Sequence, residues 1–326
     1  MTIAVVKPGF LTTFQDAGRA GLAHLGVGRA GAFDEPALRI ANALCGNPGN
    51  AAALEITLRG PTLHFHAQTW IAVTGAPIPV NIDDTDQPMW APLAVPAGAR
   101  IALGAVRSGC RSYLAVRGGF DVAPVLGSRS TDVNARLGPF NGRALQSGDE
   151  LPTPRSEPAK LDRTAPPWRV DPRPWFAGAG QERLRLMPGT HVDRLAKTSN
   201  KLLFSRDFHV HPDSNRVGLR LTGPRLEWET LGEMVSEGCV PGLLQLPPSG
   251  QPIAFGPECP VSGGYPRIGQ IAAVDMPRLA QLRPGDALRF SPCTFEDALR
   301  MLRERERALA TLENTIRHRL NGTLES

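Results

Sequence analysis

The sequence is poor in aromatic residues, and it lacks a long apolar run. Aromatic residues make up 6% of its 326 positions, and its 36 Lys and Arg are scattered along the chain although the formal net charge is +5. A nucleic-acid-binding surface needs a basic stripe with stacking aromatics, so this class of function is not expected. No stretch approaches about 18 consecutive apolar residues and no signal peptide opens the chain, so neither membrane insertion nor secretion is predicted.

The sequence also has little that could bind a metal. Its five cysteines are widely spaced and form no C-x-x-C pair, so neither a disulfide framework nor a thiolate zinc site is indicated and a reducing cytoplasm is favoured. His64 and His66, and likewise His209 and His211, place two imidazoles on one face of a predicted strand. Neither pair has an obvious third ligand, so no metal is predicted.

Three common active-site motifs are absent or incomplete. There is no G-x-x-x-x-G-K-[ST], which excludes a P-loop, and no G-x-S-x-G, which disfavours a serine hydrolase. Residues 26–31 match G-x-G-x-x-G, but no buried strand runs into the first glycine. Without that βαβ context the motif does not predict dinucleotide binding.

Glycine and proline are abundant, at 34 and 31 residues. They punctuate many short strand-like segments, which is typical of β-barrel folds. Seven of the prolines lie within residues 152–176, a composition that predicts a linker. On either side of it, residues 145–151 and 282–288 share an apolar-x-x-Gly-Asp-x-apolar pattern. The sequence therefore predicts a mainly β protein with a few helices, in two related β domains at residues 1–151 and 177–292.

Two helices are predicted from capping and periodicity. Asp34 is a suitable N-cap, Pro36 suits the first turn, and the apolar stripe that follows stops at residues 46–48. The last segment, residues 293–326, carries leucines and an isoleucine at helical spacing from Phe295 to Leu320. We expect an amphipathic helix there that packs on a domain or on a partner.

Charged residues gather between glycines, in segments where the loops of a β scaffold would carry function. Residues 15–19, 106–111 and 127–132 are of this kind in the first half, and 212–216 and 262–266 in the second. Paired arginines and carboxylates in such loops suit a small anionic substrate and proton transfer. The alternative is that these residues only cap turns and pair with one another.

Taken in order, these segments resemble the biotin-dependent carboxyltransferase family, also called KipA or allophanate hydrolase subunit 2. The resemblance covers nearly the whole chain apart from the linker and the final helix, and it is carried by residues 11–19, 24–27, 31–34, 53–56, 113–121, 126–132, 213–221, 236–238, 251–253 and 263–268. It implies two cyclophilin-like β-barrel domains and a KipI-like partner. Bacterial stand-alone members resemble the C component of an ATP-dependent 5-oxoprolinase.

The resemblance implies that the chain works with a KipI-like B component and a LamB/YcsF-like A component to open 5-oxoproline to glutamate. ATP, bound by or with a partner, would phosphorylate the lactam oxygen. One alternative is transfer of a carboxyl group from carboxybiotin to urea or a related amide, with biotin as cofactor. Another is a non-catalytic regulator that binds a KipI-like kinase inhibitor. The chain has no Met-Lys-Met biotin acceptor, so we expect it to be inactive alone.

The resemblance also guides the choice of site residues. We expect three acidic residues to act as acid/base or orienting groups, three arginines to bind anionic groups, and two further side chains to hydrogen-bond an amide or lactam. In that order they are Asp16, Asp213 and Glu237; Arg107, Arg129 and Arg216; and Gln251 and Tyr265.

Overall fold

A computed structural model of the chain describes residues 1–154, 166–176, 182–229 and 234–325, with the side chains of the last four left out. The chain divides into two compact units, and each is described by itself. The first unit consists of Met1–Arg19, Ala30–Gly178 and Ala308–Ser326, and the second of Ala20–Arg29 and Ala179–Arg307. Both units are thus built from separated stretches of sequence.

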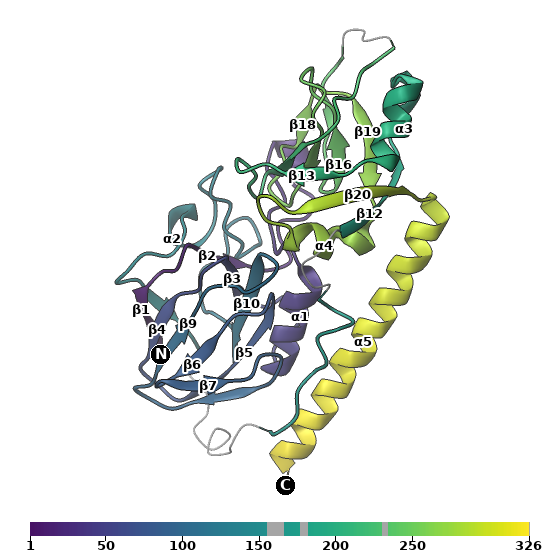
Figure 1. The fold of residues 1–326 in the computed structure, drawn as a ribbon. Coiled ribbons are helices and arrows are strands. Elements are labelled where there is room, and N and C mark those ends of the chain that lie inside the picture. Colours follow the sequence, from purple (N-terminus) through teal and green to yellow (C-terminus); the bar gives the residue numbers. More distant parts are fainter. Residues whose placement is uncertain (155–165, 177–181, 230–233, 326) are drawn as a thin grey trace. The chain divides into compact units, whose positions relative to one another are not determined.

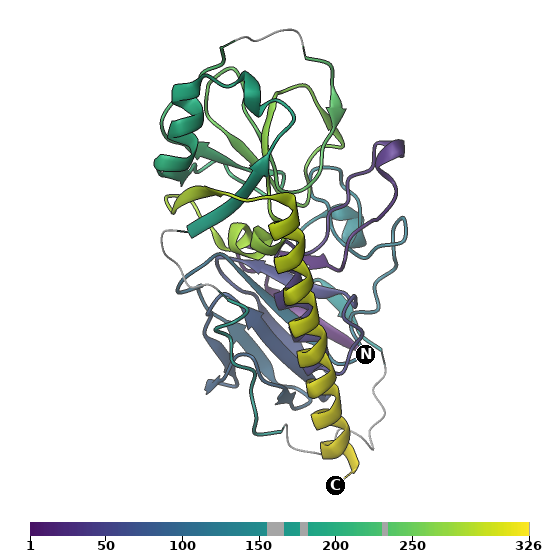
Figure 2. The ribbon, with the colours of Figure 1, turned by 90° about the vertical axis from the view of Figure 1, so that its right-hand side faces the viewer.

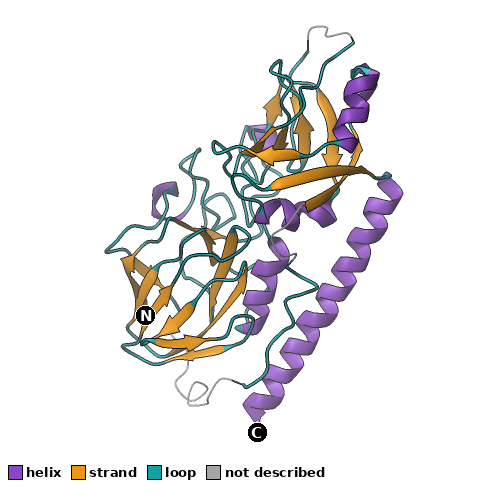
Figure 3. Ribbon diagram, viewed as in Figure 1, coloured by secondary structure: helices purple, strands orange, loops and turns teal. Residues whose placement is uncertain are grey.

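The first unit contains two antiparallel sheets (Figures 1 and 3). One has six strands in the order β11-β1-β4-β9-β6-β7 and the other has five in the order β2-β3-β10-β5-β8. The strands are β1 Thr2–Lys7, β2 Leu11–Gln15, β3 Ala53–Thr57, β4 Thr62–Phe65, β5 Thr69–Gly75, β6 Val80–Ile82, β7 Thr85–Gln87, β8 Leu93–Val95, β9 Arg100–Leu103, β10 Arg111–Val116 and β11 Glu150–Pro152.

Strands β5 and β10 are buried on both faces, and their alternating residues enter two different cores. Leu114 and Val73 belong to a core that draws on both sheets. Tyr113 and Ala72 face the other way, into a second core with helix α1 (Glu35–Leu44) and Leu309. One face of the five-stranded sheet therefore packs into the core that the two sheets share, and its other face packs against helix α1.

The second unit is a closed barrel with the strand order β12-β19-β16-β17-β14-β13-β20, in which only the β12–β20 pair is parallel. Strands β15 and β18 pair with each other in a separate two-stranded antiparallel ribbon. Alternate residues of β12, Leu184 and Leu186, are buried, as expected for a strand with one face inward. The strands are β12 Glu182–Pro188, β13 Phe208–Val210, β14 Gly218–Thr222, β15 Glu237–Gly238, β16 Leu243–Gln245, β17 Ile253–Phe255, β18 Ser262–Gly263, β19 Arg267–Ile271 and β20 Ala287–Pro292.

Both predicted helices are present. The Asp34 side chain accepts a hydrogen bond from the Ala37 N–H and caps α1, which covers the outer face of β5 and β10. Helix α5 is one continuous helix (Figure 2), and the Thr294 hydroxyl caps it by accepting from the Asp297 N–H. The helices are α1 Glu35–Leu44, α2 Pro139–Gly142, α3 Lys197–Ser205, α4 Met276–Gln281 and α5 Phe295–Glu325, with short 3₁₀ turns at Ala23–Leu25, Val192–Arg194 and Ala273–Asp275.

The prediction of a mainly β protein with a few helices in two cyclophilin-like β domains is confirmed. Part of the predicted linker, residues 155–165, lies outside the described residues. Its described remainder packs on the first unit, where Val170 is buried in the core beside α1 and Trp168 packs against it. Within the described part of the chain, no helix is both long and apolar enough to span a bilayer.

Candidate functional site

Asp16, at the end of β2, has its carboxylate in a cradle of hydrogen-bond donors inside the first unit. Its Oδ1 accepts from the hydroxyls of Ser128 at 2.6 Å and Ser130 at 2.5 Å. The Gly18 N–H donates to the same oxygen at 2.8 Å, and the Arg129 N–H donates to Oδ2 at 2.6 Å. We call Asp16 with these four donors the Asp16 cradle. It is only 8% exposed, so these donors stand in for water.

The donors decide the charge of this carboxyl group. Burial alone would raise the pKa of Asp16, but the hydrogen bonds from the two serines and from the backbone outweigh it and hold the pKa below its ordinary value of 3.8. The group is therefore ionised at neutral pH, with both oxygens engaged. Of the two roles expected for Asp16, orienting the loop is the one that this geometry supports.

The cradle joins β2 to the loop at residues 125–132. Buried Arg19 donates to the carbonyl oxygens of Val125 and Ser130, and the Gln15 amide donates to the Thr131 carbonyl oxygen. Two segments of the sequence that are more than 100 residues apart thus form one hydrogen-bonded surface. Arg129 lies on it, half-buried, with its Nε donating to the Val122 carbonyl oxygen at 2.7 Å.

A second buried network fixes the loop that leads into α1. The Tyr113 hydroxyl donates to Glu55 at 2.6 Å and accepts from the Asp34 N–H, while the Phe33 N–H also donates to Glu55. Burial, and then the Glu55 charge, raise the pKa of Tyr113. The tyrosine therefore stays a neutral donor that ties β3 and β10 to this loop.

This loop packs directly on the Asp16 segment. Gly31 has a φ of +95°, and a Cβ there would lie 3.0 Å from the Gly18 nitrogen and 3.1 Å from the Ala17 carbonyl. Only glycine fits such a close approach in this conformation. The Ala32 N–H donates to the Asp16 carbonyl oxygen at 2.9 Å. Two of the predicted charged loop segments of the first half, residues 15–19 and 127–132, thus meet the loop at residues 31–34.

In the second unit, Arg216 and Glu258 form a buried ion pair, with residue exposures of 4% and 6%. The Arg216 Nε and Glu258 Oε1 atoms are 2.5 Å apart, and the Glu258 N–H donates to the Arg216 carbonyl oxygen. The guanidinium that we expected to bind a substrate anion therefore holds an internal carboxylate. Its geometry supports a positioning role.

Glu237 lies on the ribbon strand β15, where its carboxylate pairs with Arg267 of β19 at 2.5 Å and its side chain is 46% exposed. Tyr265 follows the partner strand β18 and is 48% exposed. Gly263 of β18 lies against Gln245, since a Cβ there would lie 2.9 Å from the Gln245 amide nitrogen. Glu237 and Tyr265 are the accessible expected residues of this region.

The remaining expected residues are Asp213, Arg107 and Gln251. Asp213 is exposed, with its carboxylate 3.5 Å from the His211 ring, and Arg107 is exposed in the loop after β9. Gln251 uses both atoms of its amide on one backbone unit, since its oxygen accepts from the Gly223 N–H and its nitrogen donates to the Gly223 carbonyl oxygen. The structure thus brings Asp16 together with Arg129, whereas Gln251 forms hydrogen bonds to the backbone of Gly223.

Cysteine chemistry has no support in this arrangement. Burial raises the pKa of Cys239, and it raises that of Cys259 to about 12, which keeps both thiols protonated and poorly nucleophilic. All five cysteines are free. Across the described ranges, no three His, Cys, Asp or Glu side chains are grouped so that they could hold a metal ion.

Sequence reasoning overlooked several residues that build these sites. Ser128 and Ser130 lie in the predicted charged loop at residues 127–132, but the sequence analysis gave them no role. The placement of one serine on each side of Arg129 is the sequence signal that could have identified them. The sequence gives no local signal for Glu258 or for the pairing of Tyr113, because their partners are 42 and 58 residues away. A long-range buried pair leaves no mark in local periodicity.

The family model described as carboxyltransferase domain, subdomain A and B, matches residues 25–292. The chain is 38% identical over 307 residues to the C component of 5-oxoprolinase from Escherichia coli (strain K12), and the match covers 94% of this chain and 96% of that protein. It is also 31% identical over 334 residues to urea amidolyase of Saccharomyces cerevisiae, covering 98% of this chain and 18% of that protein.

Among solved structures, the urea amidolyase of K. lactis is similar to this chain with a TM-score of 0.87 and 30% sequence identity. The match covers 95% of this chain and 20% of that one, so the chain spans about a fifth of that structure. The urea carboxylase of Kluyveromyces lactis gives a TM-score of 0.86 at the same identity and covers 29% of that chain.

Proposed function

The chain belongs to the family of carboxyltransferase domains with subdomains A and B, and we propose that within it the chain acts as the C component of an ATP-dependent 5-oxoprolinase. One observation carries this choice: the match to the 5-oxoprolinase protein of E. coli runs along 96% of that protein at 38% identity, above the 31–32% of the urea amidolyases. The proposed reaction opens 5-oxoproline to glutamate together with a KipI-like and a LamB/YcsF-like protein.

The chemistry explains why such a reaction needs ATP. A lactam carbonyl is a poor electrophile, and transfer of the γ-phosphoryl group of ATP to its oxygen makes the carbon attackable by water. Water adds, the ring C–N bond breaks with the amine as leaving group, and hydrolysis of the resulting acyl phosphate gives glutamate and phosphate. The chain has no P-loop, so we place the ATP with a partner protein and the active site between partners.

Within this proposal the described side chains divide into two kinds. The Asp16 cradle and the Arg216–Glu258 pair position their loops, because their polar atoms are engaged inside the protein. Glu237, Tyr265 and Arg129 are the groups available to a substrate or a partner, with Glu237 as the acid/base candidate. Asp213 and Arg107 are exposed and complete the set of proposed contacts.

Reconstitution tests the proposal. The chain is purified with its KipI-like and LamB/YcsF-like neighbours, and ATP-dependent release of glutamate from 5-oxoproline is measured. We expect release with all three proteins and none when this chain is omitted. Glu237→Gln is expected to lower kcat roughly 100-fold, the usual contribution of a general acid or base. The exposed Glu229→Gln is its matched control; undiminished release without this chain would refute the proposal.

A second candidate, transfer of a carboxyl group from carboxybiotin to urea or a related amide, is favoured by the TM-score of 0.87 to urea amidolyase. It requires a biotinylated partner, because the chain has no biotin-acceptor Met-Lys-Met. Streptavidin blotting of proteins that co-purify with the chain separates the two candidates. We propose the cytoplasm as the compartment, in keeping with five free thiols.

A further inference from the structure

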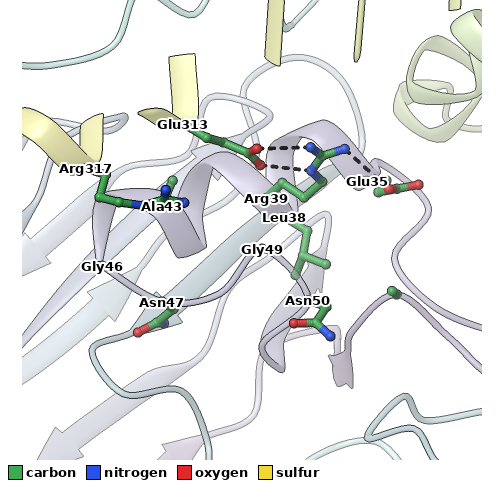
Figure 4. A pocket seen from close by; sticks show the side chains of 11 residues that line it. Glu35, Leu38, Arg39, Ala43, Gly46, Asn47, Gly49, Asn50, Glu313 and Arg317 are labelled. Carbon is green, nitrogen blue, oxygen red and sulfur yellow. Dashed lines mark hydrogen bonds and ion pairs between the residues drawn. The ribbon is translucent and has the colours of Figure 1, made fainter. Parts of the chain in front are cut away.

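Two pockets of the first unit differ in their chemistry. The smaller, of about 330 Å³, is lined by α1 and by the last turns of α5, and there Arg39 donates two hydrogen bonds to the Glu313 carboxylate at 2.9 and 3.0 Å (Figure 4). These two charges largely satisfy each other. The larger, of about 680 Å³, is lined from residues 75–90 and 169–176. Ligand sites usually occupy roughly 300–1,000 Å³ and are mostly apolar with a few polar groups, a description that fits the larger pocket.

Apolar side chains form most of the wall of the larger pocket, which we call the Trp90 pocket. They are Pro77, Pro88, Met89, Trp90, Val170 and Phe176. The Met89 sulfur accepts a hydrogen bond from the Ile78 N–H at 3.2 Å, which fixes that side chain. Two aromatic groups, two proline rings and a polarisable thioether are surfaces that pack well against a flat ring. The wall therefore favours a ligand with an aromatic body.

Trp90 has a backbone conformation that is rare for a bulky residue, with a φ of +62°. Hydrogen bonds hold it there on both sides, because its N–H donates to the Val73 carbonyl oxygen and its own carbonyl oxygen accepts from the Val170 N–H, each at 2.8 Å. Strained residues persist only where their surroundings fix them, and they cluster at ligand sites. This part of the wall is therefore preorganised.

The opposite part of the wall comes from the predicted Pro-rich linker. The bond from the Val170 N–H attaches this segment to Trp90. Further along, the Trp175 and Phe176 N–H groups both donate to the Pro172 carbonyl oxygen, at 2.9 and 2.8 Å, in a turn that places Phe176 in the lining. The described end of the linker thus helps to build a pocket as well as to connect two units.

The charged groups of the lining are two guanidinium groups and one carboxylate, Arg169, Arg173 and Asp171. The Arg173 Nη2 donates to Asp171 Oδ2 at 2.6 Å, and its Nε contacts both carboxylate oxygens at 3.0 Å. These hydrogen bonds, and to a smaller extent the charge of Arg169, lower the pKa of Asp171, so the carboxylate is ionised at neutral pH. Arg173 is thus engaged by Asp171, and the exposed Arg169 leaves the lining with a net positive charge.

We infer that the Trp90 pocket binds a small aromatic carboxylate, with its ring against the apolar wall and its carboxylate at Arg169. A guanidinium group recognises a carboxylate through paired hydrogen bonds, and a net positive lining disfavours a cation. An uncharged aromatic compound would use the apolar wall but not Arg169. None of the expected site residues lines this pocket, so the inference does not depend on the proposed reaction.

Isothermal titration calorimetry of the full chain tests the inference with two aromatic acids, cinnamate and indoleacetate. Each is compared with its neutral amide, cinnamamide or indoleacetamide, which has almost the same shape and no charge. We expect at least one acid to bind with a Kd below about 1 mM and its amide to bind about tenfold more weakly. Arg169→Gln is expected to weaken binding of the acid about tenfold and to leave that of the amide unchanged. Arg169 is exposed, so this variant is expected to fold.

The matched control is Arg206→Gln, which removes an exposed guanidinium from the second unit and is expected to leave every Kd unchanged. Phe176→Leu keeps an apolar side chain but removes the ring, and it is expected to weaken acid and amide alike. The inference is overturned if neither acid gives heat up to about 10 mM, a weak affinity even for a small ligand. It is equally overturned if acid and amide bind alike, or if Arg169→Gln and Arg206→Gln have the same effect. Failure of this test leaves the reconstitution result untouched, so the two outcomes are separable.

Discussion

Buried carboxylates of the two units are compensated in two ways, by neutral donors and by arginines, and the first unit uses both, since Glu55 there also faces buried Arg111 at 3.5 Å. In the first, the Asp16 carboxylate is compensated by neutral donors, two hydroxyls and two backbone N–H groups. In the second, buried carboxylates face arginines, as Glu258 faces Arg216 and Asp275 faces Arg185 at 3.0 Å. Compensation by neutral donors depends on a loop that places several donors around one carboxylate. Compensation by an arginine depends on a second charged side chain.

This difference has consequences for energy. Removing one member of a buried ion pair strands the other charge in a medium that solvates it poorly. Removing a carboxylate from neutral donors leaves several dipoles unsatisfied but no net charge behind. The Arg216–Glu258 pair is therefore expected to be more sensitive than the Asp16 cradle to a single polar substitution, and more tolerant of a simultaneous replacement of both partners.

The largest effect is expected from Glu258→Ala, which leaves the Arg216 guanidinium buried without its carboxylate. We expect it to lower the free energy of unfolding of the second unit by about 3–5 kcal/mol. Hydrogen–deuterium exchange with mass spectrometry reads the two units separately and checks the value. The double variant Arg216→Met with Glu258→Leu is expected to recover most of the loss, and the exposed Asp213→Asn to change little. A double variant as unstable as the single one would contradict this account.

A smaller effect is expected from Asp16→Ala in the first unit. The hydroxyls of Ser128 and Ser130 and two N–H groups lose their acceptor, which is expected to cost about 2–3 kcal/mol and to loosen residues 125–132. Faster amide exchange confined to that loop and to β2 is the expected signature. If amide exchange rose equally in the second unit, the Asp16 cradle would not act only on β2 and residues 125–132. Asp121→Asn, at an exposed position, is the matched control.

The smallest expected effect is a change of stability with pH, and its sign differs between Asp16 in the first unit and Asp275 in the second. The pKa of Asp16 is lowered in the fold, so its stabilising contribution is present above the unfolded value near 3.8 and is lost as the pH falls through the folded value. Burial raises the pKa of Asp275 in spite of Arg185 and Arg278, so its contribution is full below about 3.8 and is lost as the pH rises through the folded value.

Melting curves between about pH 3 and 6 of Asp16→Asn and Asp275→Asn, each compared with the unaltered chain, check this opposition. We expect the stability difference between variant and parent to grow with rising pH for Asp16→Asn and to shrink with rising pH for Asp275→Asn. Parallel curves for the two variants would show that donors and ion pairs act alike at these sites.

Much of the fold was predictable because its signals are local. Asp34 and Pro36 mark the start of α1, and the observed helix begins at Glu35. The leucine spacing predicted a final helix from Phe295, where α5 begins. The strands followed from short apolar segments between glycines and prolines. What local patterns could not supply was the division of the strands, two sheets in one unit and a closed barrel in the other.

The candidate sites were predictable only in part, for a related reason. The charged loops at residues 15–19 and 127–132 were recognised from their glycines, and the structure brings them together with residues 31–34. The state of each side chain was not predictable. Arg216 was expected to bind a ligand and is paired with Glu258 instead, because that partner is set by strand pairing between distant segments. The roles of Glu237 and Tyr265 stay predictions.

Helix α5 has a consequence for how the chain is made. Its residues 308–325 supply Leu309, Ile316 and Leu320 to the core beside α1, yet a ribosome translates them after the whole barrel. The barrel unit in turn includes residues 20–29, which emerge among the first. Domains usually fold in the order of their synthesis. Here the core beside α1 stays incomplete until residues 308–325 have been translated, after the barrel.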